Sequence, residues 1–266
     1  MNLSRYAPEV SAYYCNIVTN GGSIAPATLG ALSAFVNRLK AHATLWDKLD
    51  EIYPLCGRGI ASACVKLKFI STPLMINHNF GDEDFEEWGP TGGLSPDGAS
   101  KYLDSNFSAT LLRDDAHLCY IEQQPATDFG ARTAIGGTDG SLEWSIGAVD
   151  VFSDRTAIIG DPAAAATIAG GYNDWTSLYI ANRESPTSLT LFKRTHLKDT
   201  DTTGASTSPK PALNLFLCAR NNNGIADNFW KNRLRFASIG RALTSDEVAD
   251  YYQIAQSLQD ELGRSI

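Results

Sequence analysis

Carboxylates gather in the segment Asp82-Glu-Asp-Phe-Glu-Glu87, which has the residue types for acid–base chemistry. If this segment were a strand, Asp82, Asp84 and Glu86 would share one face, because side chains alternate along a strand. Retaining glycoside hydrolysis needs two carboxyl groups about 5–5.5 Å apart, which alternate strand positions can supply. The segment lacks β-branched residues and ends at Trp88-Gly-Pro90. These signals favour a solvated acidic loop, so we expect no enzyme activity.

The same carboxylates offer the oxygen ligands that Ca²⁺ prefers, but their spacing matches no EF-hand loop. The four histidines are His42, His78, His117 and His196. They lie far apart, and none pairs with another at i+3 or i+4, which argues against a transition-metal site. We therefore expect no cofactor, with calcium at the acidic segment as the alternative.

A sugar-binding loop is the remaining candidate for chemistry, in Gly171-Tyr-Asn-Asp-Trp175. An aromatic face stacks on a sugar while Asn and Asp bind its hydroxyls, usually from loops at one edge of a sandwich. Tyr172, Asn173, Asp174 and Trp175 supply that combination. The alternative is a turn followed by a strand whose Trp175 points into the core.

Composition limits the ligands of the chain. Its 266 residues are 43% hydrophobic and 20% charged, which suits one large core with a small appendage. The net charge of −8 argues against nucleic acid, because phosphate-binding surfaces need clustered Lys and Arg. Met1 to Arg5 lacks the apolar run of a secretory signal, and no stretch of about 18 apolar residues occurs. We expect neither nucleic-acid binding nor membrane insertion.

The cysteines are few and scattered. They are Cys15, Cys56, Cys64, Cys119 and Cys218, with no Cys-x-x-Cys pair. This pattern indicates buried thiols made in a reducing cytoplasm, with a Cys56–Cys64 bridge as the alternative.

Helical periodicity dominates the first fifty residues. Apolar positions predict a helix from Glu9 to Val18, a second beginning near Pro26, and a short third over Leu45 to Leu49. Their apolar faces are too short to be stable alone. We expect them to pack on the rest of the fold or on a neighbouring subunit.

From about Leu55 the period changes from 3.6 to 2, with Gly, Pro, Asn and Asp between short runs. The predicted strands are His117 to Gln123, Leu142 to Ala148, Thr156 to Ile159, Ser177 to Asn182, Leu189 to Thr195, Ala212 to Ala219 and Arg233 to Ile239. Gly136 to Gly140 reads as a turn and Thr200 to Pro211 as a mobile hairpin loop. A capping box at Thr244-Ser-Asp-Glu247 opens a final helix that ends at Gly263.

Four segments follow one another along the chain: Trp46-Asp-Lys-Leu-Asp-Glu-Ile-Tyr-Pro54, Asp97-Gly-Ala-Ser-Lys-Tyr-Leu-Asp104, Ala219-Arg-Asn-Asn-Asn-Gly224, and the run from Arg233 to Tyr252. In this order they resemble the concanavalin A-like (laminin-G-like) jelly-roll domains found in phage genomes. The last run resembles the family's final strand and closing helix.

The resemblance implies an all-β fold, a two-sheet antiparallel jelly-roll sandwich with an N-terminal helical segment and a C-terminal helix. We expect a helical anchoring segment at 1–54 and the jelly roll at 55–266. The resemblance also implies a virion location and a non-enzymatic bacteriophage structural protein, a surface-displayed capsid decoration, head fibre or tail component. Its expected partners are other virion subunits and further copies of itself.

Two other functions stay open at this point. One is a receptor-binding, lectin-like module for host surface glycans, using Tyr172 to Trp175. The other is a polysaccharide hydrolase acting through the acidic segment. One fold hosts many functions, so the family resemblance does not decide among them.

Overall fold

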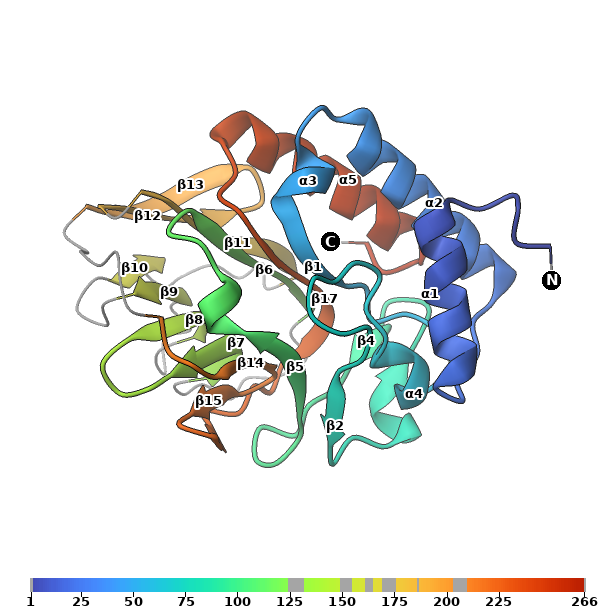
Figure 1. Ribbon diagram of the computed structural model, residues 1–266, viewed down its shortest axis with the longest axis horizontal. Helices are drawn as coiled ribbons and strands as arrows, with labels where there is room; N and C mark the ends of the chain where they lie inside the picture. Colours follow the sequence, from blue (N-terminus) through green and yellow to red (C-terminus); the bar gives the residue numbers. More distant parts are fainter. Residues whose placement is uncertain are drawn as a thin grey trace.

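The computed structural model describes residues 2–123, 132–148, 155–160, 165–168, 176–185, 187–202 and 210–265. These residues form two β-sheets packed as a sandwich, with helices on one side (Figure 1). The helices are α1 (Pro8–Thr19), α2 (Pro26–Ala41), α3 (Leu45–Lys48), α4 (Ile60–Ala63) and α5 (Ser245–Glu261), with short 3-10 helices η1 (Asp82–Asp84) and η2 (Ala109–Leu111). The predicted two-sheet sandwich with helices near both ends of the chain is confirmed.

The sheet next to the helices, here called the inner sheet, has eight strands in the described part of the chain, ordered β13-β12-β11-β6-β17-β4-β3 with β1 beside β17. The strands are β1 (Leu49–Tyr53), β3 (Phe85–Glu86), β4 (Gly93–Leu94), β6 (Ala116–Gln123), β11 (Ser177–Ser185), β12 (Ser188–Lys193), β13 (His196–Asp201) and β17 (Arg233–Gly240). Segments from both ends of the chain therefore pair within one sheet.

The other sheet, here called the outer sheet, has nine strands among the described residues, in the order β10-β9-β8-β7-β14-β5-β2, with β15 beside β7 and β16. The strands are β2 (Ile76–His78), β5 (Tyr102–Ser108), β7 (Arg132–Thr138), β8 (Glu143–Ala148), β9 (Arg155–Gly160), β10 (Ala165–Ile168), β14 (Asn214–Leu217), β15 (Arg220–Asn222) and β16 (Ile225–Asp227). β15 runs parallel to β7, whereas β5 pairs antiparallel with both β14 and β2.

One core lies between the two sheets. Leu118 and Tyr120 of β6 meet Leu103 and Phe107 of β5, and all four are fully buried. Trp144 of β8 joins the same core with 2% of its surface exposed. Every second residue of these strands faces inward, and for β6 and β8 the sequence pattern predicted this alternation.

A second core lies on the opposite face of the inner sheet. Cys119 and Ile121 of β6 point away from the sandwich and pack under the helices. Phe35 of α2 meets Phe236 of β17 edge to face, with ring centroids 5.8 Å apart. Figure 1 shows α1, α2 and α5 on this side of the molecule. The N-terminal helices were expected to pack on the rest of the fold or on a neighbouring subunit. In the structure they pack on the sandwich of the same chain.

Every strand predicted from the sequence is present, with small shifts at its ends. The turn predicted at Gly136 to Gly140 is wrong at its start, because β7 extends to Thr138 and pairs there with Glu143. The loop predicted to begin at Thr200 is also wrong there, because Thr200 lies in β13 opposite Thr190. Residues 203–209 of that loop lie outside the described residues.

The cysteine prediction is confirmed at four positions and wrong at one. Cys56, Cys64, Cys119 and Cys218 are buried free thiols, whereas Cys15 is exposed. Burial raises the pKa of both Cys56 and Cys64 to about 12. These two thiols are free, so the alternative of a bridge between them is wrong.

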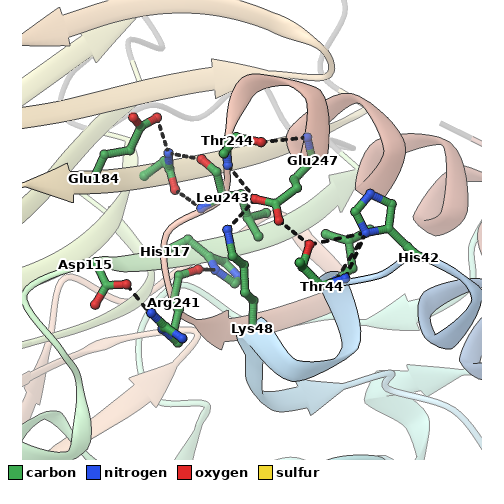
Figure 2. A network of polar contacts seen from close by, with 12 residues as sticks. His42, Thr44, Lys48, Asp115, His117, Glu184, Arg241, Leu243, Thr244 and Glu247 are labelled. Carbon is green, nitrogen blue, oxygen red and sulfur yellow. Dashed lines mark hydrogen bonds and ion pairs between the residues drawn. The ribbon is translucent and has the colours of Figure 1, made fainter.

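A polar network fixes the start of α5 to the inner sheet (Figure 2). The predicted capping box is present: Thr244 Oγ1 accepts from the Glu247 N–H at 3.3 Å, and Glu247 Oε2 accepts from the Thr244 N–H at 2.7 Å. The Glu247 carboxylate also binds Lys48 and the Thr44 hydroxyl, both from the N-terminal segment. Burial alone would raise the pKa of Glu247, but these hydrogen bonds lower it to about 2.

His117 lies behind this network and is fully buried. Its Nδ1 lies 2.7 Å from the Arg241 carbonyl oxygen, which can only accept, so Nδ1 carries the proton. Its Nε2 lies 3.3 Å from Ser238 Oγ, which in turn accepts from the Tyr251 hydroxyl at 2.7 Å. Burial of this neutral imidazole lowers the pKa of His117 to about 4.

Acid should therefore destabilise the fold before most carboxylates titrate. The pKa of His117 falls from 6.5 in the unfolded chain to about 4 in the fold. Between pH 6.5 and pH 4, His117 is protonated in the unfolded chain but neutral in the folded protein. The free energy of unfolding is therefore highest above pH 6.5 and falls as the pH drops toward 4. The shift corresponds to roughly 3 kcal/mol. Urea unfolding between pH 7.5 and pH 4 measures it.

His117→Asn keeps a donor for the Arg241 carbonyl and should flatten this pH dependence, although the variant is less stable at pH 7.5. The matched control is His196→Asn at an exposed position, which should leave the parent profile unchanged. An undiminished slope in His117→Asn would show that another group controls the acid response.

Candidate functional site

The predicted glycan-binding residues Tyr172, Asn173, Asp174 and Trp175 lie outside the described residues, so their role stays a prediction. The described chain resumes at Thr176, just before β11.

A buried ion pair joins the two sheets beside the start of β11, where Ser177 pairs with Glu122 of β6. Glu122 Oε1 accepts from Arg155 Nε at 3.0 Å and from Arg155 Nη2 at 2.6 Å, across from β9. The Arg155 guanidinium lies over the rings of Tyr179 and Trp230, at 5.4 and 5.7 Å. Burial acts to lower the pKa of Arg155, but the Glu122 carboxylate outweighs it and raises the pKa. These contacts hold the sheets together.

The acidic segment has no shared strand face for catalysis. Asp82 and Asp84 lie in η1, and of the three proposed carboxylates Glu86 alone lies in a strand, β3. Asp82 accepts from the Ile60 N–H at 2.8 Å. Both oxygens of Asp84 accept from Lys101 Nζ, at 2.6 and 2.7 Å. The alternation on which the hydrolase hypothesis rested is therefore wrong.

Glu87, the last carboxylate of the segment, is also not the solvated group that the loop prediction gave. It is 8% exposed. Its Oε1 accepts from the Thr28 hydroxyl at 2.7 Å and from the Gly57 N–H at 3.0 Å, and its Oε2 accepts from Trp88 Nε1 at 2.9 Å. Glu87 thus ties α2 to two loops.

The buried Arg264 side chain reinforces this junction. Its guanidinium donates to the carbonyl oxygens of Glu87 at 2.7 Å, Leu55 at 3.1 Å, and Arg235 and Glu86 at 3.3 Å each. A guanidinium presents several donors in a fixed plane, which suits four acceptors from separate segments.

A patch of mixed apolar and polar side chains lies on the outward face of β2 and β5, and we call Ile76, His78, Tyr102 and Asp104 the β2–β5 face. Register places Ile76 opposite Asp104 and His78 opposite Tyr102. Ile76 is 48% exposed, and the other three are half-buried. Leu103, between Tyr102 and Asp104, points the other way into the core.

Ring stacking makes the β2–β5 face rigid. The His78 and Tyr102 rings are 4.2 Å apart and within 5° of parallel. Tyr102 also stacks on Phe216 of β14, with centroids 4.7 Å apart and planes at 30°. Tyr102 lies between them because β5 lies between β2 and β14 in the outer sheet. Such cross-strand pairs stabilise a sheet and fix its side chains.

The carboxylate of Asp104 is oriented as well. Its Oδ1 accepts from the Asn106 N–H at 2.8 Å, and its Oδ2 accepts from Asn214 Nδ2 at 3.2 Å. Each oxygen keeps capacity for a further hydrogen bond, since an ionised carboxylate has about four acceptor sites. The face therefore offers apolar surface beside a fixed acceptor, a combination that suits small polar ligands.

Sequence reasoning did not single out these residues as a site. Tyr102 and Asp104 belong to the stretch Asp97 to Asp104 that carried the family resemblance, which was the available signal. Ile76 and His78 carry no such signal, and strand pairing alone brings them next to β5.

A separate pocket of about 310 Å³ lies on the other side of β2. It is lined by Asn20, Ile60, Ala61, Cys64, Met75 and Asn77. Its thiol is no nucleophile at neutral pH, because burial raises the pKa of Cys64 to about 12.

Among the described residues, no group of three or more His, Cys, Asp or Glu side chains is arranged to hold a metal ion. Within the same part of the chain, no helix has the length and hydrophobicity to cross a bilayer.

None of the protein-family models matches the chain. The search of curated proteins also gave no match.

Solved structures give similarity in fold. The chain is similar to domain 4 of AbnA, a GH43 extracellular arabinanase from Geobacillus stearothermophilus solved with arabinotriose, at 12% identity over 77% of this chain and 98% of that one, with a TM-score of 0.49. It is similar to the CBM40 of the Ruminococcus gnavus IT-sialidase bound to α2,3-sialyllactose, at 10% identity over 59% and 92% of the two chains, TM-score 0.43. It also matches 28% of the length of the NanB sialidase from Streptococcus pneumoniae, at 15% identity over 59% of this chain, TM-score 0.43.

Removal of the Arg264 side chain should destabilise the fold strongly. Arg264→Ala leaves four carbonyl oxygens without their donor, and hydrogen bonds from a charged donor contribute about 1.5–3 kcal/mol each without full additivity. We expect a loss of at least about 3 kcal/mol in the free energy of unfolding. Chemical denaturation measures the loss.

Arg264→Lys should recover little of this stability, since an ammonium cannot reproduce the planar set of donors. Arg58→Ala at an exposed position is the matched control and should change stability by less than about 0.5 kcal/mol. Equal effects of the Arg264 and Arg58 variants would contradict the structural role of Arg264.

Proposed function

We propose that this protein is a non-catalytic, surface-displayed subunit of a bacteriophage virion that binds carbohydrate through the β2–β5 face. The observation that carries the binding proposal is the rigid juxtaposition of Ile76, His78, Tyr102 and Asp104 on a sheet face that points away from both cores. The virion setting is supported by the sequence resemblance alone.

Sugar rings combine C–H surface with hydroxyl groups. The β2–β5 face offers apolar contact for the first and hydrogen-bonding groups for the second. The half-exposed Ile76 side chain and the ring edges supply apolar contact. The Asp104 carboxylate accepts from hydroxyls, and the Tyr102 hydroxyl can donate or accept. Stacking already holds the Tyr102 ring, so binding costs little side-chain entropy.

Display from a particle fits the division of the molecule into two sides. The helices lie on the inner sheet, while the β2–β5 face belongs to the outer sheet (Figure 1). The apolar faces of α1 and α2 are buried within the chain, so anchoring to other virion subunits would use the remaining surface of the helical layer. We also propose that the subunit associates with further copies of itself. It would act without a cofactor and without calcium.

Substitution at Ile76 tests the binding face. Ile76→Glu places a charged, longer side chain beside Asp104 and should weaken glycan binding at least about tenfold, the loss of roughly 1.4 kcal/mol of contact. A printed array of neutral and acidic oligosaccharides, followed by calorimetry on the ligands found, measures the change. The proposed glycan function is abandoned if the parent protein binds no saccharide on the array.

Ile225 provides the matched control, because it is 73% exposed on the hairpin between β15 and β16. Ile225→Glu adds the same charge elsewhere on the outer sheet and should leave affinity unchanged. Equal losses in both variants would locate the binding away from the β2–β5 face. Melting temperatures of the two variants show whether each retains the fold.

Cryo-EM of intact particles at side-chain resolution tests the virion proposal separately. The expected result is this chain on the particle exterior, with its helical layer toward neighbouring subunits. Its absence from purified particles would remove the virion proposal and leave the binding proposal standing.

A further inference from the structure

We infer that the β2–β5 face selects neutral, hydroxyl-rich saccharides and rejects those that carry sialic or uronic acid. This inference rests on the proposed function, and it concerns the charge of the ligand. The face carries a fixed negative charge, and Lys66, Lys101, Arg132 and Arg220 are already bound to other groups.

Asp104 supplies the negative charge. Its side chain is half-buried and held by Asn106 and Asn214, so it cannot swing away from an approaching anion. Both of these partners are neutral donors. A ligand carboxylate placed beside Asp104 would meet a like charge, whereas a hydroxyl would find an acceptor.

Two lysines close to this face, Lys66 and Lys101, are bound to other carboxylates. Lys66 lies 2.9 Å from Glu51, and both side chains are fully buried. Lys101, the residue before Tyr102, is held by both oxygens of Asp84 at 2.6 and 2.7 Å. An acidic sugar would have to replace one of these carboxylates to gain a cation.

Two arginines of the outer sheet are also engaged, Arg220 by carboxylates and Arg132 by backbone carbonyls. Arg220 donates to both oxygens of Asp227, at 2.9 Å each, and to Glu143 at 3.0 Å. Arg132 donates to two backbone carbonyls, at 2.8 and 3.2 Å. Neither guanidinium is left as a receptor for a ligand carboxylate.

The parts of the sequence outside the described residues supply no further side-chain cation. The residues outside the described ranges, 1, 124–131, 149–154, 161–164, 169–175, 186, 203–209 and 266, include no Lys, Arg or His, but do include Asp. The net charge of the whole chain is −8. The long-range field therefore also opposes an anionic ligand.

Matched pairs of glycans test the inference directly. The probes are neutral oligosaccharides of glucose, galactose, mannose and arabinose, each printed beside a counterpart of equal length with a terminal sialic or uronic acid. At pH 8 the parent protein should bind at least one neutral member and should bind its acidic counterpart at least about tenfold more weakly. Its neutral affinity should change less than about twofold between 0.05 and 0.5 M NaCl, because screening acts on charged pairs.

A positive charge added to the face gives the second measurement. Ile76→Lys should narrow or reverse the preference for the neutral member, while Ile225→Lys should leave it as in the parent. Asp104→Asn keeps an acceptor for Asn106 and should also narrow the preference.

The outcomes separate the two proposals. If the parent protein binds acidic saccharides more tightly than neutral ones, and Ile76→Glu loses that binding, the inferred selectivity is wrong. The proposal that the β2–β5 face binds saccharides then stands. If Ile76→Glu leaves saccharide binding unchanged, the proposal that the β2–β5 face binds saccharides is wrong, and so is the selectivity. The same holds if the parent protein binds no saccharide at all.

Discussion

Both faces of the inner sheet are apolar, and burial of both faces governs how the molecule is arranged. On β6, Leu118 and Tyr120 face the outer sheet, while Cys119 and Ile121 face the helices. Exposure of either set to water would lose about 25 cal/mol for each Å² of apolar surface. The sandwich partner and the helical layer are therefore both needed, and neither is an appendage to a complete domain. β17 has the same two-sided character, with Ala237 toward one core and Phe236 toward the other.

That constraint also explains why polar side chains can occur on the outward face of the outer sheet. β5 alternates between half-buried and buried residues along its whole length, the pattern of a strand with one face on a core. Its outward residues need not be apolar, so Tyr102 and Asp104 are tolerated there beside Asn106. The inner sheet has no comparable freedom, because helices or the other sheet cover its central strands. The β2–β5 face thus lies on the sheet face where burial restricts residue type least.

Local signals predicted those parts of the fold that local physics determines. The capping box at Thr244 and Glu247 and the period-2 runs of β6, β8 and β17 all lie where the sequence indicated. β5 was missed because Asp104, Ser105 and Asn106 are turn-forming residues that sheet pairing overrides. β7 was missed for a similar reason, since Gly136 and Gly137 read as a turn. The β2–β5 face could not be foreseen, because it depends on register between strands far apart in sequence.

The Arg264 contacts bear on the order in which the chain can fold as it is synthesised. The carbonyls that its guanidinium binds belong to residues 55, 86, 87 and 235, three of them made in the first third of the chain. β1 likewise pairs with β17. The N-terminal helices and loops are therefore synthesised before β17 and Arg264, and they lack these stabilising contacts until the rest of the chain has been made. Such long-range pairing slows folding and leaves apolar surface exposed in the meantime. Yield in a cell should thus depend on chaperones more than the stability of the finished fold suggests.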